Sequence, residues 1–421
     1  MASGREKELA MGVLIRYEGF RWLWIGQLLS QLGNAVFLIM GLWEIQLRSP
    51  FLLSIAGLAM VVPSMLAVGG GVVVDRRDPR WLMLVTDAAR GLAVALGIVA
   101  LTIPGSLVVV VIALLGINSL GAALFGPAEG VLVPRLVADK DLPAANGVYS
   151  LTSQLASAVG SAVGGAAVVA IGVRVVFGLD MGSFWLSALA IALMMRTVAA
   201  RPRALAHGRA DGSGGLLPQL GTGWQALQGL PAILTLMPLI LLANFAYMAA
   251  FTMLPFWIRH QLHATALWYG LVDAGWAGGL VLGSLLAGSL SRRPIRVSTA
   301  LMFGAQGLLV GLFTVAATPV LAAAVLFGSG IANGIANALL LTLIQRLVPE
   351  AVRGRAFGLL MTLTALANPL GTLAAGVLLH VLPLWWAWTL SAVTGIALAV
   401  GVYATVPADV AAAGNVRTTS L

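Results

Sequence analysis

Four acidic residues stand inside long uncharged stretches of the sequence, where an ionised carboxylate would have to leave water. A carboxylate in such a place is a candidate for reversible proton binding, because a buried charge is costly unless it is neutralised or paired. Asp273 lies deepest in its stretch, beside Trp276, and is the preferred candidate. Glu129 lies nearer the end of its stretch, within reach of Arg135. The candidate proton-coupling acids are Asp273, Glu44, Glu129 and Asp180.

Uncharged polar residues in the same stretches are candidates for lining an internal cavity. Gln31 and Asn34 fall within one stripe of a helix when residues are placed at 100° intervals. Such amides can face water or a ligand, but they also form hydrogen bonds between helices, so both roles stay open. The predicted cavity residues are Gln31, Asn34, Asn118, Asn244, Trp276, Asn337 and Asn368.

The elements that must position these residues follow from the composition. The chain has 421 residues, of which 60% are apolar and 9% charged, whereas a soluble domain has about 25% charged residues. At about 20 residues per membrane-spanning helix, the apolar residues suffice for roughly twelve spans. This composition excludes a soluble enzyme, a nucleic-acid-binding protein and a secreted disulfide-linked scaffold.

Charge-free stretches and proline breaks locate the spans, and together they predict an all-α membrane protein of twelve transmembrane helices in two six-helix halves. The expected spans are Trp22–Leu47, Phe51–Val74, Trp81–Ile103, Leu107–Val133, Asn146–Ile171, Val175–Met195, Ile233–Trp257, Leu267–Leu290, Val297–Ala316, Val320–Ile344, Ala356–Leu379 and Leu384–Val406. The expected segments are a cytoplasmic amino terminus (1–20), the first half (21–197), a cytoplasmic linker (198–230), the second half (231–406) and a cytoplasmic tail (407–421).

The positive residues indicate the orientation of these spans. With a cytoplasmic amino terminus, 20 of the 24 Lys and Arg residues fall on the cytoplasmic side and 3 outside, while Arg90 lies within a span. By the positive-inside rule, both termini are therefore expected in the cytoplasm. The net charge of +9 is explained by this topology and does not require nucleic acid as a partner.

The two halves show an internal repeat. A shift of 211 residues carries Arg135-Leu-Val onto Arg346-Leu-Val, Gly160 onto Gly371 and Gly165 onto Gly376. Parallel repeats that face each other across a cavity are a common plan among transport proteins. Glycines spaced four apart also let helices approach closely, so we expect helix-packing roles for Gly160, Gly164, Gly165, Gly371 and Gly376.

A charged loop follows the second expected span, with the sequence Gly71-Val-Val-Val-Asp75-Arg76-Arg77-Asp78-Pro79-Arg80. This loop resembles the signature loop of the major facilitator superfamily. The stretches Trp81–Arg90, Phe125-Gly-Pro-Ala and Leu142-Pro-Ala-Ala-Asn-Gly are similar to the branch of drug, macrolide and siderophore exporters called transmembrane secretion effectors. The resemblance covers about residues 15 to 406.

This resemblance implies a cytoplasmic gate or latch, in which charges at helix ends hold one transport state. Its residues here would be Gly71, Asp75, Arg76 and Arg80, with Asp87 and Arg90 as neighbours. The arginines could alternatively serve only as positive-inside residues. Gly160-Ser-Ala-Val-Gly-Gly resembles the antiporter motif of drug exporters without its proline, although generic helix packing also explains it. The antiporter subgroup has an arginine in its fourth helix, and Leu107–Ala128 contains none.

The resemblance further implies a secondary active transporter in the bacterial cell (inner) membrane, not an enzyme, which exports hydrophobic or amphipathic small molecules by alternating access driven by the proton gradient. Two alternatives stay open: an importer or lysolipid flippase on the same fold, and a non-transporting membrane sensor or partner protein. The expected partners are a small-molecule substrate, protons and the lipid bilayer, with no nucleic acid, and the chain is expected to be a monomer. No phosphate-binding loop, clustered histidine or cysteine is present, so we expect no cofactor and no metal.

Overall fold

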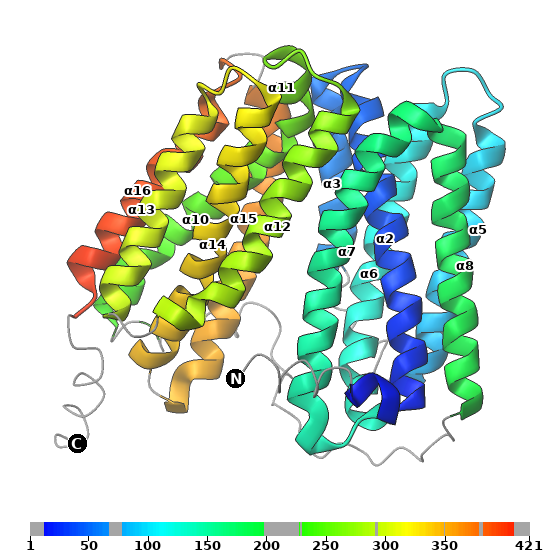
Figure 1. Cartoon of the computed structure of the whole chain (residues 1–421), viewed down its shortest axis with the longest axis horizontal. Helices are drawn as coiled ribbons and strands as arrows, with labels where there is room; N and C mark the ends of the chain where they lie inside the picture. The colour runs from blue at the N-terminus through cyan, green and yellow to red at the C-terminus, as the bar shows by residue number, and fades with distance from the viewer. Residues whose placement is uncertain are drawn as a thin grey trace. The chain divides into compact units, whose positions relative to one another are not determined.

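The computed structural model describes residues 12–66, 78–197, 227, 230–290, 294–348, 350–378 and 382–407, and the regular structure in this part of the chain is entirely helical (Figure 1). Ten of these helices are long and apolar enough to cross a membrane. They are α2 (Glu18–Gln46), α5 (Pro79–Ala100), α6 (Leu107–Leu136), α7 (Leu142–Ala170), α8 (Val173–Thr197), α10 (Pro231–Thr252), α12 (Ala266–Leu290), α13 (Ile295–Phe313), α14 (Pro319–Leu347) and α16 (Trp386–Thr405).

Two further helices, α3 (Pro50–Leu66) and α15 (Glu350–Leu378), occupy the places of the second and eleventh expected spans. Among the described residues, the apolar helical segments at these two places are Phe51–Pro63 and Ala367–Leu378. The all-α membrane fold predicted from the sequence is therefore confirmed, and ten of the twelve expected spans are identified within the part of the chain that the structure describes.

Large apolar side chains cover the outward faces of the long helices. On α5, Leu92, Leu96 and Val99 are 56%, 62% and 66% exposed at helical spacing. A water-soluble protein does not present such continuous apolar faces, whereas hydrocarbon solvates them. The exposed faces therefore identify the surface that contacts lipid.

The ends of two helices are fixed by side chains that the sequence places there. Asp78 precedes α5 and accepts a hydrogen bond from the backbone N–H of Arg80, with Pro79 at the first helical position. Thr318 caps α14 in the same way through Leu321 N–H, followed by Pro319. Proline at this position loses no intrahelical bond, so both helices begin abruptly.

The chain divides into two compact units, which are described separately. The first unit comprises Met1–Arg201 with Leu254–Ala274, and the second comprises Pro202–Met253 with Gly275–Leu421. Leu254–Ala274, which includes α11 (Leu254–His260), thus packs with the first unit, although the sequence predicts that it belongs to the second half. The predicted division into six-helix halves stays a prediction.

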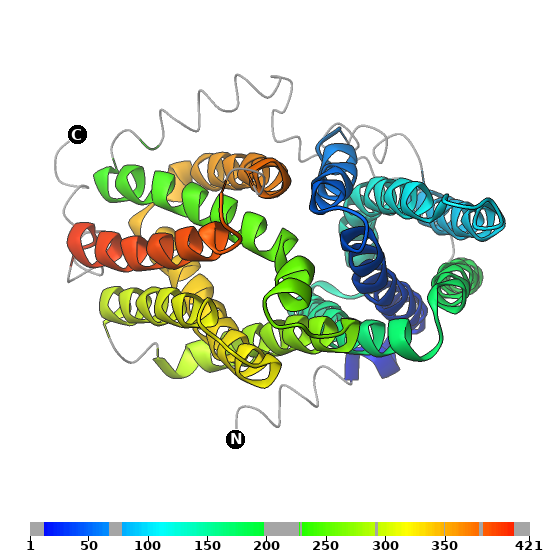
Figure 2. The same cartoon turned by 90° about the horizontal axis from the view of Figure 1, so that it is seen from above.

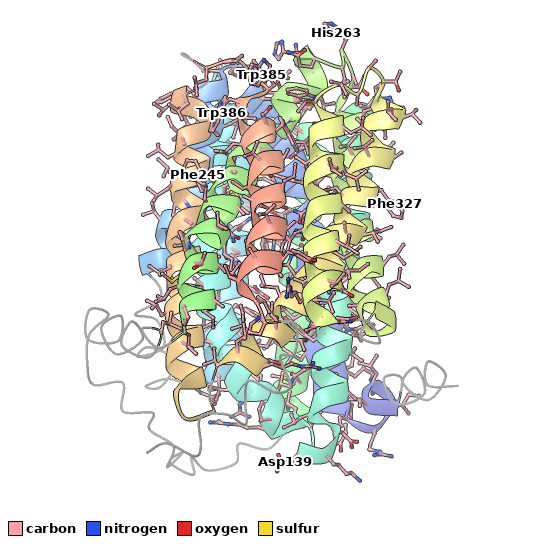
Figure 3. All side chains as sticks on the ribbon, turned by 90° about the vertical axis from the view of Figure 1, so that its left-hand side faces the viewer. Asp139, Phe245, His263, Phe327, Trp385 and Trp386 are labelled. Carbon is pink, nitrogen blue, oxygen red and sulfur yellow. The ribbon has the colours of Figure 1, made fainter. Side chains whose placement is uncertain are left out.

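In the first unit, α2 is the central helix and packs against α7, α8, α6 and α3 (Figure 2). Phe20 and Leu23 of α2 are fully buried with Met83 of α5. Asp139 and His263 lie at opposite ends of this unit (Figure 3). In the second unit, α13 packs against α14 and α16, and α10 packs against α15 and α16. The second core includes Phe303, Leu343 and Leu398.

Pro63 interrupts the hydrogen-bond ladder of α3, because it has no N–H to donate to the carbonyl of Ala59. Helix α6 covers this position: Gly116 lies beside the Ala59 carbonyl, and the Ser119 hydroxyl donates to the carbonyl of Met60. The neighbouring helix thus supplies a donor to the Met60 carbonyl, next to the carbonyl that the proline leaves without its helical partner.

The seventh expected span, Ile233–Trp257, is interrupted. Helix α10 ends at Thr252, and α11 begins at Leu254. Pro255 cannot donate the backbone hydrogen bond that would continue the first helix, which explains the break at Met253. The seventh expected span is therefore present as α10, and its carboxyl end lies at Thr252 instead of Trp257.

Candidate functional site

A buried ion pair lies in the first unit, within helix α5. Arg90 Nη1 is 3.3 Å from Asp87 Oδ1, three residues earlier on the same face of the helix. Asp87 is fully buried and Arg90 is 5% exposed. The Ser187 hydroxyl of α8 donates to the second carboxylate oxygen of Asp87 at 2.6 Å. An unpaired charge at the centre of a bilayer costs about 2.5–3.5 kcal/mol on insertion scales, so each partner stabilises the other here.

The guanidinium of Arg90 is held by groups from two further helices. Its Nη2 donates to the backbone carbonyl of Asn118 on α6 at 2.6 Å, and it lies 5.3 Å from the ring centre of Phe184 on α8. Gly121 of α6 makes room for it, since a Cβ at that position would collide with the guanidinium. Arg90 thus connects α5 with α6 and α8, and its position depends on the absence of a side chain at Gly121.

A second carboxylate, Asp180 of α8, lies beside this pair. It is 1% exposed and close enough to interact electrostatically with Arg90. Neither of its oxygens makes a hydrogen bond of normal distance and angle, and the Asn118 amide of α6 is the neighbouring side chain that could donate one. Arg90 Nε is likewise without a partner. Unsatisfied buried polar atoms are rare in folded proteins, which sets this cluster apart from the rest of the first unit.

A network of amide and hydroxyl groups occupies another part of the first unit. The Tyr149 hydroxyl of α7 donates to Gln27 Oε1 of α2 at 2.9 Å, and Gln31 Nε2 donates to the Tyr149 oxygen at 3.4 Å. Glu129 of α6 lies beside the same hydroxyl. The sequence predicts that Glu129 pairs with Arg135, but the ion pairs of the described residues do not include this one. Glu129 lies beside Tyr149 instead.

Asp273 of α12 also belongs to the first unit. Its Oδ2 accepts a 2.6 Å hydrogen bond from the Ser161 hydroxyl of α7. The two helices approach closely nearby, because a Cβ on Gly165 would lie 2.5 Å from the carbonyl oxygen of Ala266 and 3.0 Å from Gly270 Cα. The acid therefore sits at a glycine-mediated contact between α7 and α12.

Glu44 lies near the end of α2, where Arg48 and Arg259 are its charged neighbours. On the adjoining α11, burial and the positive charges of Arg259 and His263 lower the pKa of His260. This end of the first unit is therefore rich in positive charge. Among the described residues, no group of three metal-ligating side chains could hold a metal ion.

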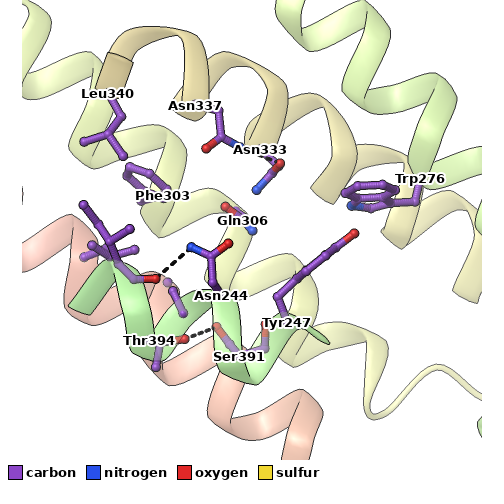
Figure 4. Close-up of a pocket in the computed structure, with 14 residues that line it drawn as sticks. Asn244, Tyr247, Trp276, Phe303, Gln306, Asn333, Asn337, Leu340, Ser391 and Thr394 are labelled. Carbon is purple, nitrogen blue, oxygen red and sulfur yellow. Dashed lines mark hydrogen bonds between the residues drawn. The ribbon is translucent and has the colours of Figure 1, made fainter. Parts of the chain in front are cut away.

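The second unit contains a cavity of about 160 Å³ (Figure 4). Amides from three helices point into it: Asn244 of α10, Gln306 of α13, and Asn333 with Asn337 of α14. The lining contains no Asp, Glu, Lys, Arg or His; it comprises Ile240, Ala243, Asn244, Tyr247, Trp276, Phe303, Gln306, Asn333, Asn337, Leu340, Ser391, Thr394, Gly395 and Leu398.

Three of these amides already form hydrogen bonds. Asn337 Nδ2 donates to Asn333 Oδ1 at 2.8 Å, and Asn244 Nδ2 donates to the carbonyl of Ile240 at 2.8 Å. Gln306 Oε1 is buried without a hydrogen-bond partner. On one side the wall is aromatic, with the ring centres of Tyr247 and Trp276 5.4 Å apart. The cavity can therefore accept a small group that is apolar on one side and donates a hydrogen bond on the other.

Comparison with known proteins decides the family. The family described as Major Facilitator Superfamily matches residues 23–372 and also 257–420. The chain belongs to the Major Facilitator Superfamily. It is similar to the multidrug efflux pump Tap of Mycobacterium tuberculosis (strain ATCC 25618 / H37Rv), with 28% identity over 366 residues. The aligned region covers 83% of this chain and 84% of Tap.

A second relative is macrolide efflux protein A of Streptococcus pyogenes, with 23% identity over 379 residues, 85% of this chain and 88% of that protein. Among solved structures, a bacterial homologue of the iron transporter ferroportin in the inward-facing state superposes with a TM-score of 0.66. That match has 17% identity and covers 91% of this chain and 98% of the other, so it supports the fold alone.

The expected latch of this facilitator is only partly visible. Gly71, Asp75 and Arg76 lie outside the described residues. Arg80 binds Asp78, with Nη2 2.7 Å from Oδ2. This hydrogen bond holds the pKa of the Asp78 carboxyl below its usual range.

Other predicted residues are distributed over both units. Asn34 is partly buried on α2, and Asn368 Oδ1 of α15 is buried without a hydrogen-bond partner. Of the expected cavity residues, Asn244, Trp276 and Asn337 line the cavity of the second unit. Gln31 and Asn118 lie in the two polar clusters of the first unit.

The predicted packing glycines lie on two helices. On α7, Gly160 and Gly164 lie against α2, and Gly165 lies against α12. On α15, Gly371 faces the carbonyl of Phe245, and Gly376 is buried.

Sequence reasoning missed two features of the site. Ser187 and Tyr149 were not singled out, because a single hydroxyl in an apolar stretch gives no pattern. The three-residue spacing of Asp87 and Arg90, in contrast, is a signal for pairing on one helix face and could have identified the buried ion pair.

Proposed function

We propose that this facilitator exports hydrophobic or amphipathic small molecules across the bacterial cell (inner) membrane by alternating access, driven by the proton gradient. The observation that carries the proposal is the uncharged, amide- and aromatic-lined cavity of the second unit. A site without charged groups favours neutral or weakly polar cargo, since nothing in it would offset the desolvation of an ionic group. Its volume accommodates a ring or side group of a larger molecule.

Two relatives add support for export. Tap is named as a multidrug efflux pump, and the streptococcal relative as a macrolide efflux protein. Both share more than four fifths of their length with this chain. The distribution of Lys and Arg supports a cytoplasmic location of both termini. In this arrangement, the loop containing Gly71, Asp75, Arg76 and Arg80 serves as the cytoplasmic latch.

Proton coupling is proposed from the carboxylates within the apolar helices. Glu44, Glu129, Asp180 and Asp273 lie on helices that can cross the membrane, and one elementary charge moved across 100 mV supplies about 2.3 kcal/mol. The chain acts as a monomer and moves its cargo without chemical change.

Efflux of ethidium and erythromycin from a pump-deficient bacterial strain tests the proposal, with and without a protonophore. We expect efflux by the wild type that the protonophore abolishes. Trp276→Ala, in the cavity, should reduce it several-fold, whereas Trp385→Ala, an exposed tryptophan outside the cavity, should leave it unchanged. Cellular accumulation of the compounds above that of the empty strain would instead favour an importer. Absence of any difference from the empty strain would contradict multidrug export.

A further inference from the structure

The first unit holds two carboxylates and one guanidinium in a single buried cluster, formed by Asp87, Arg90 and Asp180. If both acids were ionised, the cluster would carry a net negative charge inside the membrane. One bound proton makes it neutral. The cluster is therefore electrically neutral only when one of the two carboxylates carries a proton.

The hydrogen bonds show which carboxylate that is. Asp87 accepts from Arg90 Nη1 and from the Ser187 hydroxyl, as an ionised carboxylate does. Asp180 accepts no hydrogen bond of normal geometry, although the Asn118 amide lies beside it, and both its oxygens are buried. An ionised carboxylate without donors is the most costly state a buried acid can have, whereas a protonated one is a neutral group with a single donor.

The surroundings of Asp180 offer partners for both of its states. The Asn118 side chain can accept a hydrogen bond from the protonated acid through its Oδ1, or donate to the ionised acid through its Nδ2. The unpartnered Arg90 Nε can donate to the ionised acid. Apart from Arg90, no Asp, Glu, Lys, Arg or His among the described residues interacts electrostatically with Asp180. On α8 the Ser183 hydroxyl donates to the backbone carbonyl of Asp180, and Gly33 of α2 lies beside its carboxylate.

We propose that Asp180 is a proton-binding residue of this transporter, and that Arg90 is shared between Asp87 and Asp180. With a proton from water bound to Asp180, Arg90 pairs with Asp87, as in this structure. When Asp180 releases the proton to water, its carboxylate becomes a second acceptor for Arg90, which stays protonated throughout. The rearrangement shifts the contact of α5 with α6 and α8. This inference rests on the proposed proton-driven export and names the site where that proton binds.

The test uses the purified full-length protein without cargo. Infrared difference spectra between acidic and alkaline buffers report protonated carboxyl groups by their C=O stretching band, which shifts in deuterated water. We expect Asp180→Asn to lose one such band. Asp273→Asn, which removes a carboxylate that does not contact Arg90, should retain the band assigned to Asp180.

Asp87→Asn provides a second, independent variant. It removes the present counter-ion of Arg90, so Asp180 should become that counter-ion and stay ionised. The Asp180 band should therefore disappear although Asp180 itself is present. A spectrum in which Asp87→Asn retains this band, or in which Asp180→Asn loses none, would overturn the proposal.

Efflux measurements on the same variants separate this proposal from the proposed function. Asp180→Asn should lose the protonophore-sensitive part of efflux, at least ten-fold relative to the wild type. A wild type that shows no efflux while the infrared band still behaves as expected would support Asp180 as a proton-binding residue and contradict proton-driven export. If efflux is proton-driven and unaffected by Asp180→Asn, export stands and the assignment of Asp180 fails.

Discussion

Ser161 Oγ of α7 donates a 2.6 Å hydrogen bond to Asp273 Oδ2 of α12, beside the backbone contact of Gly165 with Gly270. The serine is buried, so its hydroxyl satisfies the carboxylate at a place where little water can do so. The Ser161 hydroxyl thus lowers the free-energy cost of placing the Asp273 carboxylate between α7 and α12.

Ser161→Ala should destabilise the protein by about 1.5–3 kcal/mol, because it removes a hydrogen bond to a charged group. Thermal unfolding of the detergent-solubilised protein measures this as a lower melting temperature. Ser157→Ala, an exposed serine on the same helix, is the matched control and should change little. Equal melting temperatures for the two variants would show that the Ser161 hydrogen bond contributes nothing. Addition of Asp273→Asn to Ser161→Ala should cost less than it does in the wild type, since the two residues interact.

Gly121→Ala should abolish transport while the protein still folds into the membrane. The added methyl group would occupy the space of the Arg90 guanidinium and displace it from the Asn118 carbonyl. Overpacking of this kind typically destabilises by about 1–3 kcal/mol. Gly126→Ala on the same helix meets no atom within 4 Å and is the matched control. Dye efflux and membrane abundance of both variants check the prediction, which wild-type efflux by Gly121→Ala would contradict.

Gln306→Met should leave stability unchanged or raise it, because the buried Oε1 of Gln306 has no hydrogen-bond partner to lose. The same change should weaken binding of cargo that donates a hydrogen bond into the cavity. Melting temperature and the concentration dependence of efflux measure the two effects separately. A marked loss of stability would show that Gln306 supports the fold instead of facing cargo.

Asp78→Ala should shorten or fray the start of α5, at a cost of about 0.5–2 kcal/mol for the lost cap. Because the bond to Arg80 lowers the pKa of Asp78, the ionised cap stabilises the folded state fully above the usual value of 3.8. This contribution is lost as the pH falls through the lower pKa of the folded state. The difference in melting temperature between wild type and Asp78→Ala should therefore be constant near neutral pH and shrink in strong acid. A difference that grows on acidification would contradict the role of the ionised carboxylate.

Much of the helical plan could be predicted from the sequence. The Pro104-Gly105 break does separate α5 from α6, and Thr318-Pro319 does begin α14. These signals are local, because proline and a capping threonine act within one turn. The break before Pro255 was harder to predict, since hydropathy alone does not register the loss of one backbone donor.

The site could be predicted only in part, because its chemistry depends on contacts between distant segments. Asp180 was identified as a candidate, but nothing in its neighbourhood in the sequence points to Asn118 or Arg90. Asp273 and Trp276 stand three residues apart, yet one bonds Ser161 in the first unit and the other lines the cavity of the second. Which neighbour each side chain meets is decided by tertiary packing.

The i, i+3 pairing of Asp87 with Arg90 also bears on how the protein is made. Both charges arrive at the membrane on α5, and together they can insert as a neutral pair, although each alone would oppose insertion by about 2.5–3.5 kcal/mol. Asp180 has no cation one turn away on α8, and that helix is synthesised later. Helix α5 therefore places the Arg90 guanidinium in the bilayer before α8 is made. When α8 inserts, Asp180 can interact with this positive charge, which lowers the cost of its insertion. The positive charge is thus synthesised with its first counter-ion, Asp87, and before its second, Asp180.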